Sequence, residues 1–220
     1  MEDNRQNSLQ KDSRSPWQKW INPRSCALGC VCYLAGFMTV PAILIADSNR
    51  PEIKKERFLN REINSCQNCD LAFEDFALRN FNEADFSGAN LQEAIFGATQ
   101  LSDANFSKAN LERAILRQAN LARANFEGAN LSQADFSCGA GTCTYLSDTN
   151  FRHANLTGAN FQAVGFTPAG ETGLPNVDFT GADLTRADFT YASVKGALME
   201  KVKLCETTMP DGTISNRDCQ

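Results

Sequence analysis

Histidine is nearly absent from the sequence, which has only His153 among its 220 residues. No serine or cysteine nucleophile stands beside it, and no glycine-rich phosphate-binding loop occurs in the chain. Histidine-based catalysis, histidine-ligated metal sites and phosphate-loop nucleotide binding each need residues that are missing here. The sequence therefore predicts a protein that is not an enzyme, has no cofactor or metal ion, and takes no small-molecule substrate.

Basic residues are too few for a general nucleic-acid-binding surface. The chain has 21 Lys and Arg against 26 Asp and Glu, which gives a net charge of −5. A surface that binds nucleic acid non-specifically is usually strongly basic. Nucleic acid is therefore not an expected partner.

The sequence contains instead a short repeat. Its clearest copies are ADFSGANL at 84–91, ANFSKANL at 104–111 and ANFEGANL at 124–131. The finer period is five residues, with Leu or Phe at each centre, usually Ala two positions before it and Asn or Asp one before. On a helix, successive centres would lie about 140° apart, and on a straight strand they would alternate between faces. The chain must therefore turn once in every pentad.

A second period of twenty residues predicts four pentads, and hence four sides, in each coil of a solenoid. Equivalent centres should stack in columns, so that Phe126 is followed by Leu146, and Leu131 by Phe151. Alanines fill the space between the large core side chains. The predicted core ladder consists of Leu71, Phe76, Phe81, Phe86, Leu91, Phe96, Leu101, Phe106, Leu111, Leu116, Leu121, Phe126, Leu131, Phe136, Leu146, Phe151, Leu156, Phe161, Phe166, Phe179, Leu184 and Phe189.

This pattern of Ala, Asp or Asn, Leu or Phe and two variable positions resembles the pentapeptide-repeat family over residues 66–204. The resemblance implies an all-β solenoid, a right-handed quadrilateral β-helix. Several aspartates precede repeat centres, where Asn and Asp alternate. We expect them to make structural hydrogen bonds and not to form a catalytic cluster; they are Asp85, Asp135, Asp178, Asp183 and Asp188.

Two irregularities interrupt the repeat. The centres keep their phase across the Gly-rich stretch from Cys138 to Cys143, which predicts a local distortion without an insertion. Phe166 and Phe179 are thirteen residues apart, which predicts that eight residues bulge out within a loop at 167–176.

The segments before the repeats predict a membrane attachment and an N-terminal cap. Residues 1–24 form a polar tail, and residues 25–46 are an uncharged run long enough to cross a bilayer as a helix. A cleaved signal peptide is the alternative interpretation of that run. Residues 47–65 predict a helix that caps the solenoid, because an uncapped solenoid exposes core side chains at its end.

Six cysteines occur as three local pairs: Cys66 with Cys69, Cys138 with Cys143, and Cys205 with Cys219. Disulfides are the favoured interpretation, and they suit an oxidising compartment. Free thiols, and a redox pair or zinc half-site at the first pair, are the alternatives. The last pair closes a C-terminal cap at 205–220, which is similar to the endings of membrane-targeted or exported cyanobacterial members of the family.

We therefore expect a non-enzymatic interaction or scaffold protein, tethered to a membrane, with its solenoid in the thylakoid lumen or periplasm. A cleaved, soluble form in the same compartment is the second choice. The expected partner is an unknown protein such as a subunit of a membrane complex. The alternative function, implied by the family resemblance, is a DNA-mimicking inhibitor of a type II topoisomerase. Residues 66–204 have 16 acidic against 10 basic side chains, but Lys108, Arg113, Arg117 and Arg123 interrupt the acidic surface.

Overall fold

The computed structural model describes residues 50–138, 142–167 and 170–220, and it describes side chains in these ranges except at 166–167 and 170–171. The predicted polar tail at 1–24 and membrane helix at 25–46 lie outside the described residues. Within the described ranges, no helix has both the length and the apolar character needed to span a bilayer.

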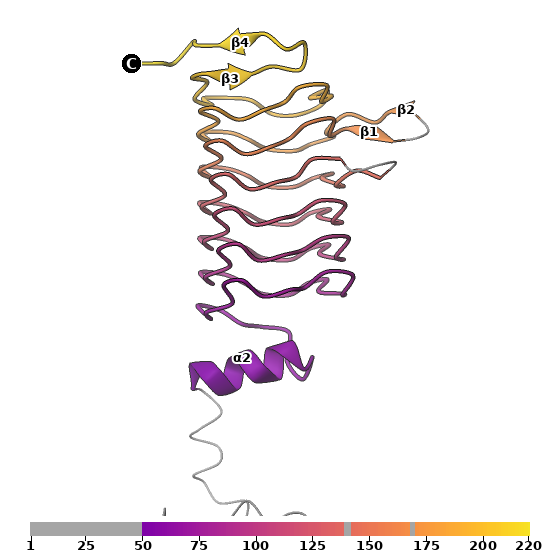
Figure 1. The fold of residues 1–220 in the computed structure, drawn as a ribbon, viewed down its shortest axis with the longest axis vertical. Coiled ribbons are helices and arrows are strands. Elements are labelled where there is room, and N and C mark those ends of the chain that lie inside the picture. The colour runs from indigo at the N-terminus through magenta and orange to yellow at the C-terminus, as the bar shows by residue number, and fades with distance from the viewer. Residues whose placement is uncertain (1–49, 139–141, 168–169) are drawn as a thin grey trace, which may run out of the picture. The chain divides into compact units, whose positions relative to one another are not determined.

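The described chain forms a stack of square coils between two caps (Figure 1). Parallel bridges join residues twenty apart, as in the series Asp85, Asn105 and Asn125. Between bridges the chain makes a tight turn, in which the N–H of Ala89 donates to the carbonyl of Phe86 at 2.9 Å. The third residue of that turn, Gly88, has a φ of 66°, as type II turns require. The predicted β-helix with one turn per pentad is confirmed.

We label the four sides by their core centres. Side A has Phe86, Phe106 and Phe126, side B has Leu91, Leu111 and Leu131, side C has Phe96, Leu116 and Phe136, and side D has Leu101, Leu121 and Leu146. The residue immediately before each centre points outward, and the two turn residues after each centre form the edge to the next side.

The core is a continuous column of rings and aliphatic groups. Phe106 stacks between Phe86 and Phe126, with ring centroids 4.8 and 4.7 Å apart. Rings of sides A and C meet edge to face, as Phe96 and Phe106 do at 5.8 Å and 86°. Such pairs add to the stabilisation that comes from burial alone. Every residue of the predicted core ladder is at most 2% exposed, apart from Phe166, whose side chain is outside the description.

The prediction of a distortion without an insertion at Cys138–Cys143 is wrong. The bridge partners are twenty residues apart before this point, but Asn125 pairs with Asn150, twenty-five residues on. One whole pentad has been added, and the phase survives because five residues equal the period. The columns consequently shift by one side, so that Phe126 stacks on Phe151 at 5.1 Å and not on Leu146.

The predicted loop at 167–176 is shorter than expected. Asn150 pairs with Asp178, twenty-eight residues on, so eight extra residues are present as predicted. Strands β1 (Phe166–Thr167) and β2 (Gly170–Glu171) form an antiparallel hairpin, which places the expected centre Phe166 in a strand of the insertion. Leu174 is only 2% exposed, and the next carbonyl, that of Pro175, accepts the N–H of Asp148 at 2.9 Å. Leu174 therefore belongs to the core of side D.

Each end of the solenoid is covered (Figure 1). Helix α2 (Pro51–Leu59) ends six residues before the predicted limit at 65, and residues 47–49 of that prediction lie outside the described residues. It has a proline in its first turn, where a missing N–H costs nothing. Its residue Phe58 is fully buried and lies 5.3 Å from the ring of Phe81. At the other end, β3 (Thr207–Thr208) and β4 (Ile214–Ser215) form an antiparallel hairpin.

Candidate interaction surface

The outward positions of sides A and B form two ladders of amide side chains. On side B, Asn110 Nδ2 donates to Asn90 Oδ1 at 3.3 Å, and Asn130 Nδ2 donates to Asn110 Oδ1 at 3.0 Å. Asn110 Oδ1 also accepts the backbone N–H of Glu112 at 3.3 Å. The same arrangement links Asn125 and Asn105 on side A at 3.4 Å. These amides use their hydrogen-bonding groups within the solenoid, so sides A and B offer little to a partner.

The aspartates that precede repeat centres are spread over three sides and do not converge. Each accepts a backbone N–H two residues ahead, as Asp135 does from Ser137 at 3.0 Å and Asp178 does from Thr180 at 2.8 Å. Burial alone would raise the pKa of Asp135, but hydrogen bonds from Arg117 and Ser137 outweigh it and lower that pKa. These carboxylates are held ionised by structural bonds, as expected from their place in the repeat.

Ion pairs between coils neutralise part of the acidic surface. Arg123 Nη2 lies 2.6 Å from Asp103 Oδ2, and Arg117 Nη2 lies 2.5 Å from Asp135 Oδ2. Lys203 Nζ contacts Asp183 Oδ2 at 3.1 Å. Since a cation stands beside each of these carboxylates, the acidic side chains do not form an uninterrupted face.

In the first coils, side C differs from sides A and B because its outward positions expose apolar side chains. Ile95 and Ile115 occupy the outward position where other coils have Asn or Asp, and they are 37% and 39% exposed. They pair with each other across neighbouring coils. Phe73 and Leu78, in the turns on either side of side C, are 67% and 83% exposed. We call these four residues the side-C patch.

The repeat period alone does not predict the side-C patch, although the sequence contains a signal for it. The pentad pattern places Asn or Asp before each centre and polar residues in the turns. Ile95, Ile115, Phe73 and Leu78 are apolar residues in positions that the pattern makes polar. A search for apolar exceptions at solvent-facing positions would have found them.

Both insertions leave the solenoid at the edge between sides C and D, after the side-C centres Phe136 and Phe161. Figure 1 shows the β1–β2 hairpin projecting outward from the stack. The N–H of Cys138 donates to the carbonyl of Gln162 at 3.1 Å, which ties the base of the first insertion to the coil that carries the second. Tyr191, 78% exposed, lies at the same edge one coil further on. This C–D edge is the least regular part of the surface.

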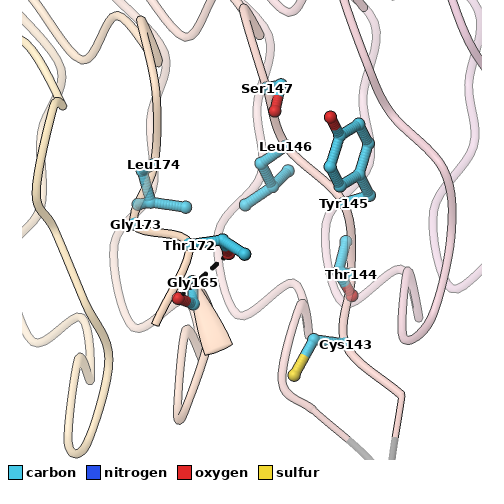
Figure 2. Close-up of a pocket in the computed structure, with 9 residues that line it drawn as sticks. All are labelled: Cys143, Thr144, Tyr145, Leu146, Ser147, Gly165, Thr172, Gly173 and Leu174. Atoms are coloured by element: carbon cyan, nitrogen blue, oxygen red, sulfur yellow. Dashed lines mark hydrogen bonds between the residues drawn. The ribbon is translucent and has the colours of Figure 1, made fainter. Parts of the chain in front are cut away.

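A small pocket lies on side D between the two insertions (Figure 2). The N–H of Gly173 donates to the carbonyl of Gly165 at 2.9 Å, and Thr172 Oγ1 donates to the same carbonyl at 3.1 Å. These two hydrogen bonds join the beginning and the end of the hairpin at its base. The pocket has a volume of about 40 Å³, which suits about one or two water molecules. It is too small for a substrate or cofactor.

The structure pairs all six cysteines of the predicted sets. Disulfides join Cys66 to Cys69, Cys138 to Cys143 and Cys205 to Cys219. They lie at the first repeat, at the first insertion and at the C-terminal cap. A sulfur in a disulfide is not a thiolate, so these pairs offer neither a metal ligand nor a free nucleophile.

A parallel β-helix that turns every five residues and closes each coil in twenty defines a class of repeat solenoids. The chain belongs to the pentapeptide repeat family, whose pattern matches eight copies in residues 65–97, 99–137, 143–167 and 174–204. The family's right-handed β-helix is therefore the architecture of this chain. Two of the breaks between matched ranges, at 137–143 and 167–174, coincide with the two insertions.

Several solved structures resemble the chain in fold. Rfr23, a pentapeptide repeat protein from the cyanobacterium Cyanothece 51142, is 20% identical with a TM-score of 0.39, covering 71% of this chain and 94% of that one. QnrB1, a plasmid-mediated fluoroquinolone resistance protein, is 18% identical with a TM-score of 0.42, covering 70% and 80%. A pentapeptide repeat protein from the Arabidopsis thaliana thylakoid lumen is 21% identical with a TM-score of 0.21, covering 69% and 73%. Among curated proteins, none matched the sequence.

Proposed function

We propose that the solenoid is a non-enzymatic interaction or scaffold module, and that a partner protein binds the side-C patch and the adjoining C–D edge. The observation that carries this proposal is the contrast between sides. The amides of sides A and B hydrogen-bond to one another, whereas Phe73, Leu78, Ile95 and Ile115 stay exposed on one side of the first coils. Grouped exposed apolar side chains are typical of interaction sites, and solenoids present extended surfaces for them.

Site-specific photocrosslinking in membranes of the source organism tests this proposal. A photoreactive residue in place of Ile115 should capture a defined partner, whereas one in place of Lys108, at the edge between sides A and B of the same coil, should not. The variant Ile95→Asn/Ile115→Asn restores the polar pattern of the neighbouring coils and should abolish capture without loss of folding. Equal capture from both positions, or none from either, would contradict the proposal.

We also propose that the run at 25–46 anchors the solenoid to a membrane and that the solenoid lies in the thylakoid lumen or periplasm. A cleaved, soluble form there is the second choice. Three disulfides support an oxidising compartment. Protease protection on sealed membranes, combined with mass spectrometry of thiols in natively isolated protein, tests both points. Six free thiols among the paired cysteines, or a solenoid digested from the cytosolic side, would overturn this placement.

The acidic excess of residues 66–204 favours a second candidate, a DNA-mimicking inhibitor of a type II topoisomerase. Its surface would need long unbroken acidic faces, and the pairs Arg123–Asp103 and Arg117–Asp135 interrupt them. We therefore expect no inhibition in a gyrase supercoiling assay at concentrations that saturate partner binding. Inhibition that is reversed by Asp103→Lys would favour this second function over the first.

A further inference from the structure

The C-terminal end of the solenoid core contains an apolar cavity. Its volume is about 220 Å³. The floor is formed by Leu184 and Phe189, both at most 2% exposed, and Val202 on the wall is 3% exposed. The remaining lining residues are Val194, Met199, Leu204, Met209 and Arg217.

The cavity exists because three columns of the core become smaller in the same layer. Met199 follows Phe179 on side A, and Met209 follows Phe189 on side C, as the backbone bonds from Phe179 to Leu198 and from Phe189 to Thr208 show. On side D, Val194 follows Leu174. Below this layer, rings stack closely, as Phe161 and Phe189 do at 4.9 Å. A ring in the last layer would continue that contact, but the chain has flexible methionines there.

No further coil covers this layer. After Met209 the chain turns back and forms β4 antiparallel to β3, so it does not continue along side D. Ile214, twenty residues after Val194, is 63% exposed and does not close the layer. The returning tail covers the cavity with Arg217, which the disulfide between Cys205 and Cys219 holds in place.

We propose that this cavity binds an uncharged apolar molecule of about nine non-hydrogen atoms, because a 150 Å³ apolar cavity takes benzene. Methionine suits this role since its unbranched side chain adapts to ligands of different shape. Arg217 does not call for an anionic ligand. Its Nη2 donates to the Val202 carbonyl at 2.6 Å, and its Nε donates to Asp218 Oδ2 at 2.9 Å. The charge at the wall is therefore already paired.

The NMR signals of the four methionine methyl groups of the chain can report whether a ligand binds in the cavity. The full chain is labelled with [methyl-¹³C]methionine, reconstituted in lipid nanodiscs and titrated with 1-octanol. Met199 and Met209 line the cavity, whereas Met1 and Met38 precede the repeats in the sequence and are internal controls. We expect the signals of the two cavity methyls to shift along one saturable curve. Octanoate should bind at least about tenfold more weakly, because its carboxylate would enter without a free partner.

Two filled variants and one matched control complete the experiment. Val194→Phe and Met209→Phe place a ring in the cavity, so the Met199 signal should no longer respond to octanol. Ile214→Phe adds a ring on the exposed face of β4 and should leave the response unchanged. A Met199 signal that does not saturate, that responds equally in the filled variants, or that prefers octanoate to octanol would overturn the proposal.

Discussion

At the scale of single residues, asparagine and aspartate before a repeat centre are not equivalent. In the ladders the side-chain N–H of each asparagine donates to the residue at the same position in the preceding coil. Its side-chain oxygen accepts a hydrogen bond from the asparagine in the following coil. Asp70 can begin a ladder because it only needs to accept, and Asn90 Nδ2 donates to it at 2.9 Å. Asp178 follows Asn150 and cannot donate to it, and Arg152 Nη1 instead donates to Asp178 Oδ2 at 3.1 Å. An ionised aspartate inside a ladder therefore breaks the chain of amides.

This difference predicts the effects of two substitutions at Asn110. Asn110→Asp loses only the donor to Asn90 and should lower the free energy of unfolding by about 1 kcal/mol at pH 7, whereas Asn110→Ala also removes the acceptor for Asn130 and should cost about 2 kcal/mol. Urea unfolding at pH 7 measures this. Equal losses for the two variants at pH 7 would refute the ladder.

The ion-paired aspartates predict acid sensitivity. Burial raises the pKa of Asp183, but hydrogen bonds from Thr185 and Lys203 lower it by more, so its pKa lies below the ordinary value. Asp135 behaves alike. As the pH falls, these aspartates take up protons in the unfolded chain before they do so in the folded chain, since the pKa of an unperturbed aspartate is about 3.9. Stability should be constant above about pH 5 and fall below about pH 4. The urea concentration at the midpoint of unfolding, measured as a function of pH, tests this prediction. Stability should fall less steeply with pH in Asp135→Asn. An increase of stability on acidification would contradict the lowered pKa values.

At the scale of elements, the regular repeat could be predicted from the sequence, but the geometry of its interruptions could not. The period of five residues identified the core centres because side chains alternate between core and solvent in a fixed order. It could not reveal the inserted pentad after Phe136, because an insertion of one full period leaves the phase unchanged. Leu174 falls within the predicted loop at 167–176 because that prediction takes Phe179 as the next centre after Phe166. The side-C patch went unnoticed for a related reason: the period predicts what faces inward and says nothing of outward exceptions such as Ile95.

Two glycines at the base of the hairpin insertion, Gly165 and Gly173, lie closer to the backbone of the next coil than a turn glycine of the regular repeat does. Gly128, Gly165 and Gly173 all have positive φ, so replacement by alanine costs each about 1 to 2 kcal/mol in backbone conformation. A Cβ on Gly165 would lie 2.5 Å from the carbonyl oxygen of Ser193, and one on Gly173 would lie 2.5 Å from that of Lys195. On Gly128 the nearest atom would be 3.8 Å away.

We therefore expect Gly128→Ala to lower the free energy of unfolding by about 1 to 2 kcal/mol. Gly165→Ala and Gly173→Ala should each cost more than about 3 kcal/mol, because backbone atoms must shift as well. Chemical unfolding of the three variants compares them directly. Equal losses in the free energy of unfolding at all three positions would contradict the close contact between the hairpin base and the next coil.

At the scale of the whole solenoid, each coil contacts only its two neighbours, so stability is a sum of local terms. The ends are its weak points, and each is covered by a different device. Helix α2 buries Phe58 against the rings of the first coils. The C-terminal hairpin has few buried side chains of its own and depends on the disulfide between Cys205 and Cys219, which closes a loop with a sequence separation of 14.

Removal of that disulfide should therefore loosen one end of the solenoid and leave the middle unchanged. A loop of this size contributes about 3 kcal/mol in the chain-entropy model, which corresponds to a loss of hydrogen-exchange protection of up to about a hundredfold. In Cys205→Ala/Cys219→Ala we expect this loss at the amides of Phe179 and Leu184, which bond to the last coil, but not at Phe106. Cys66→Ala/Cys69→Ala should loosen the opposite end. A uniform loss along the chain would mean that the coils unfold as one cooperative unit, and the local description of stability would fail.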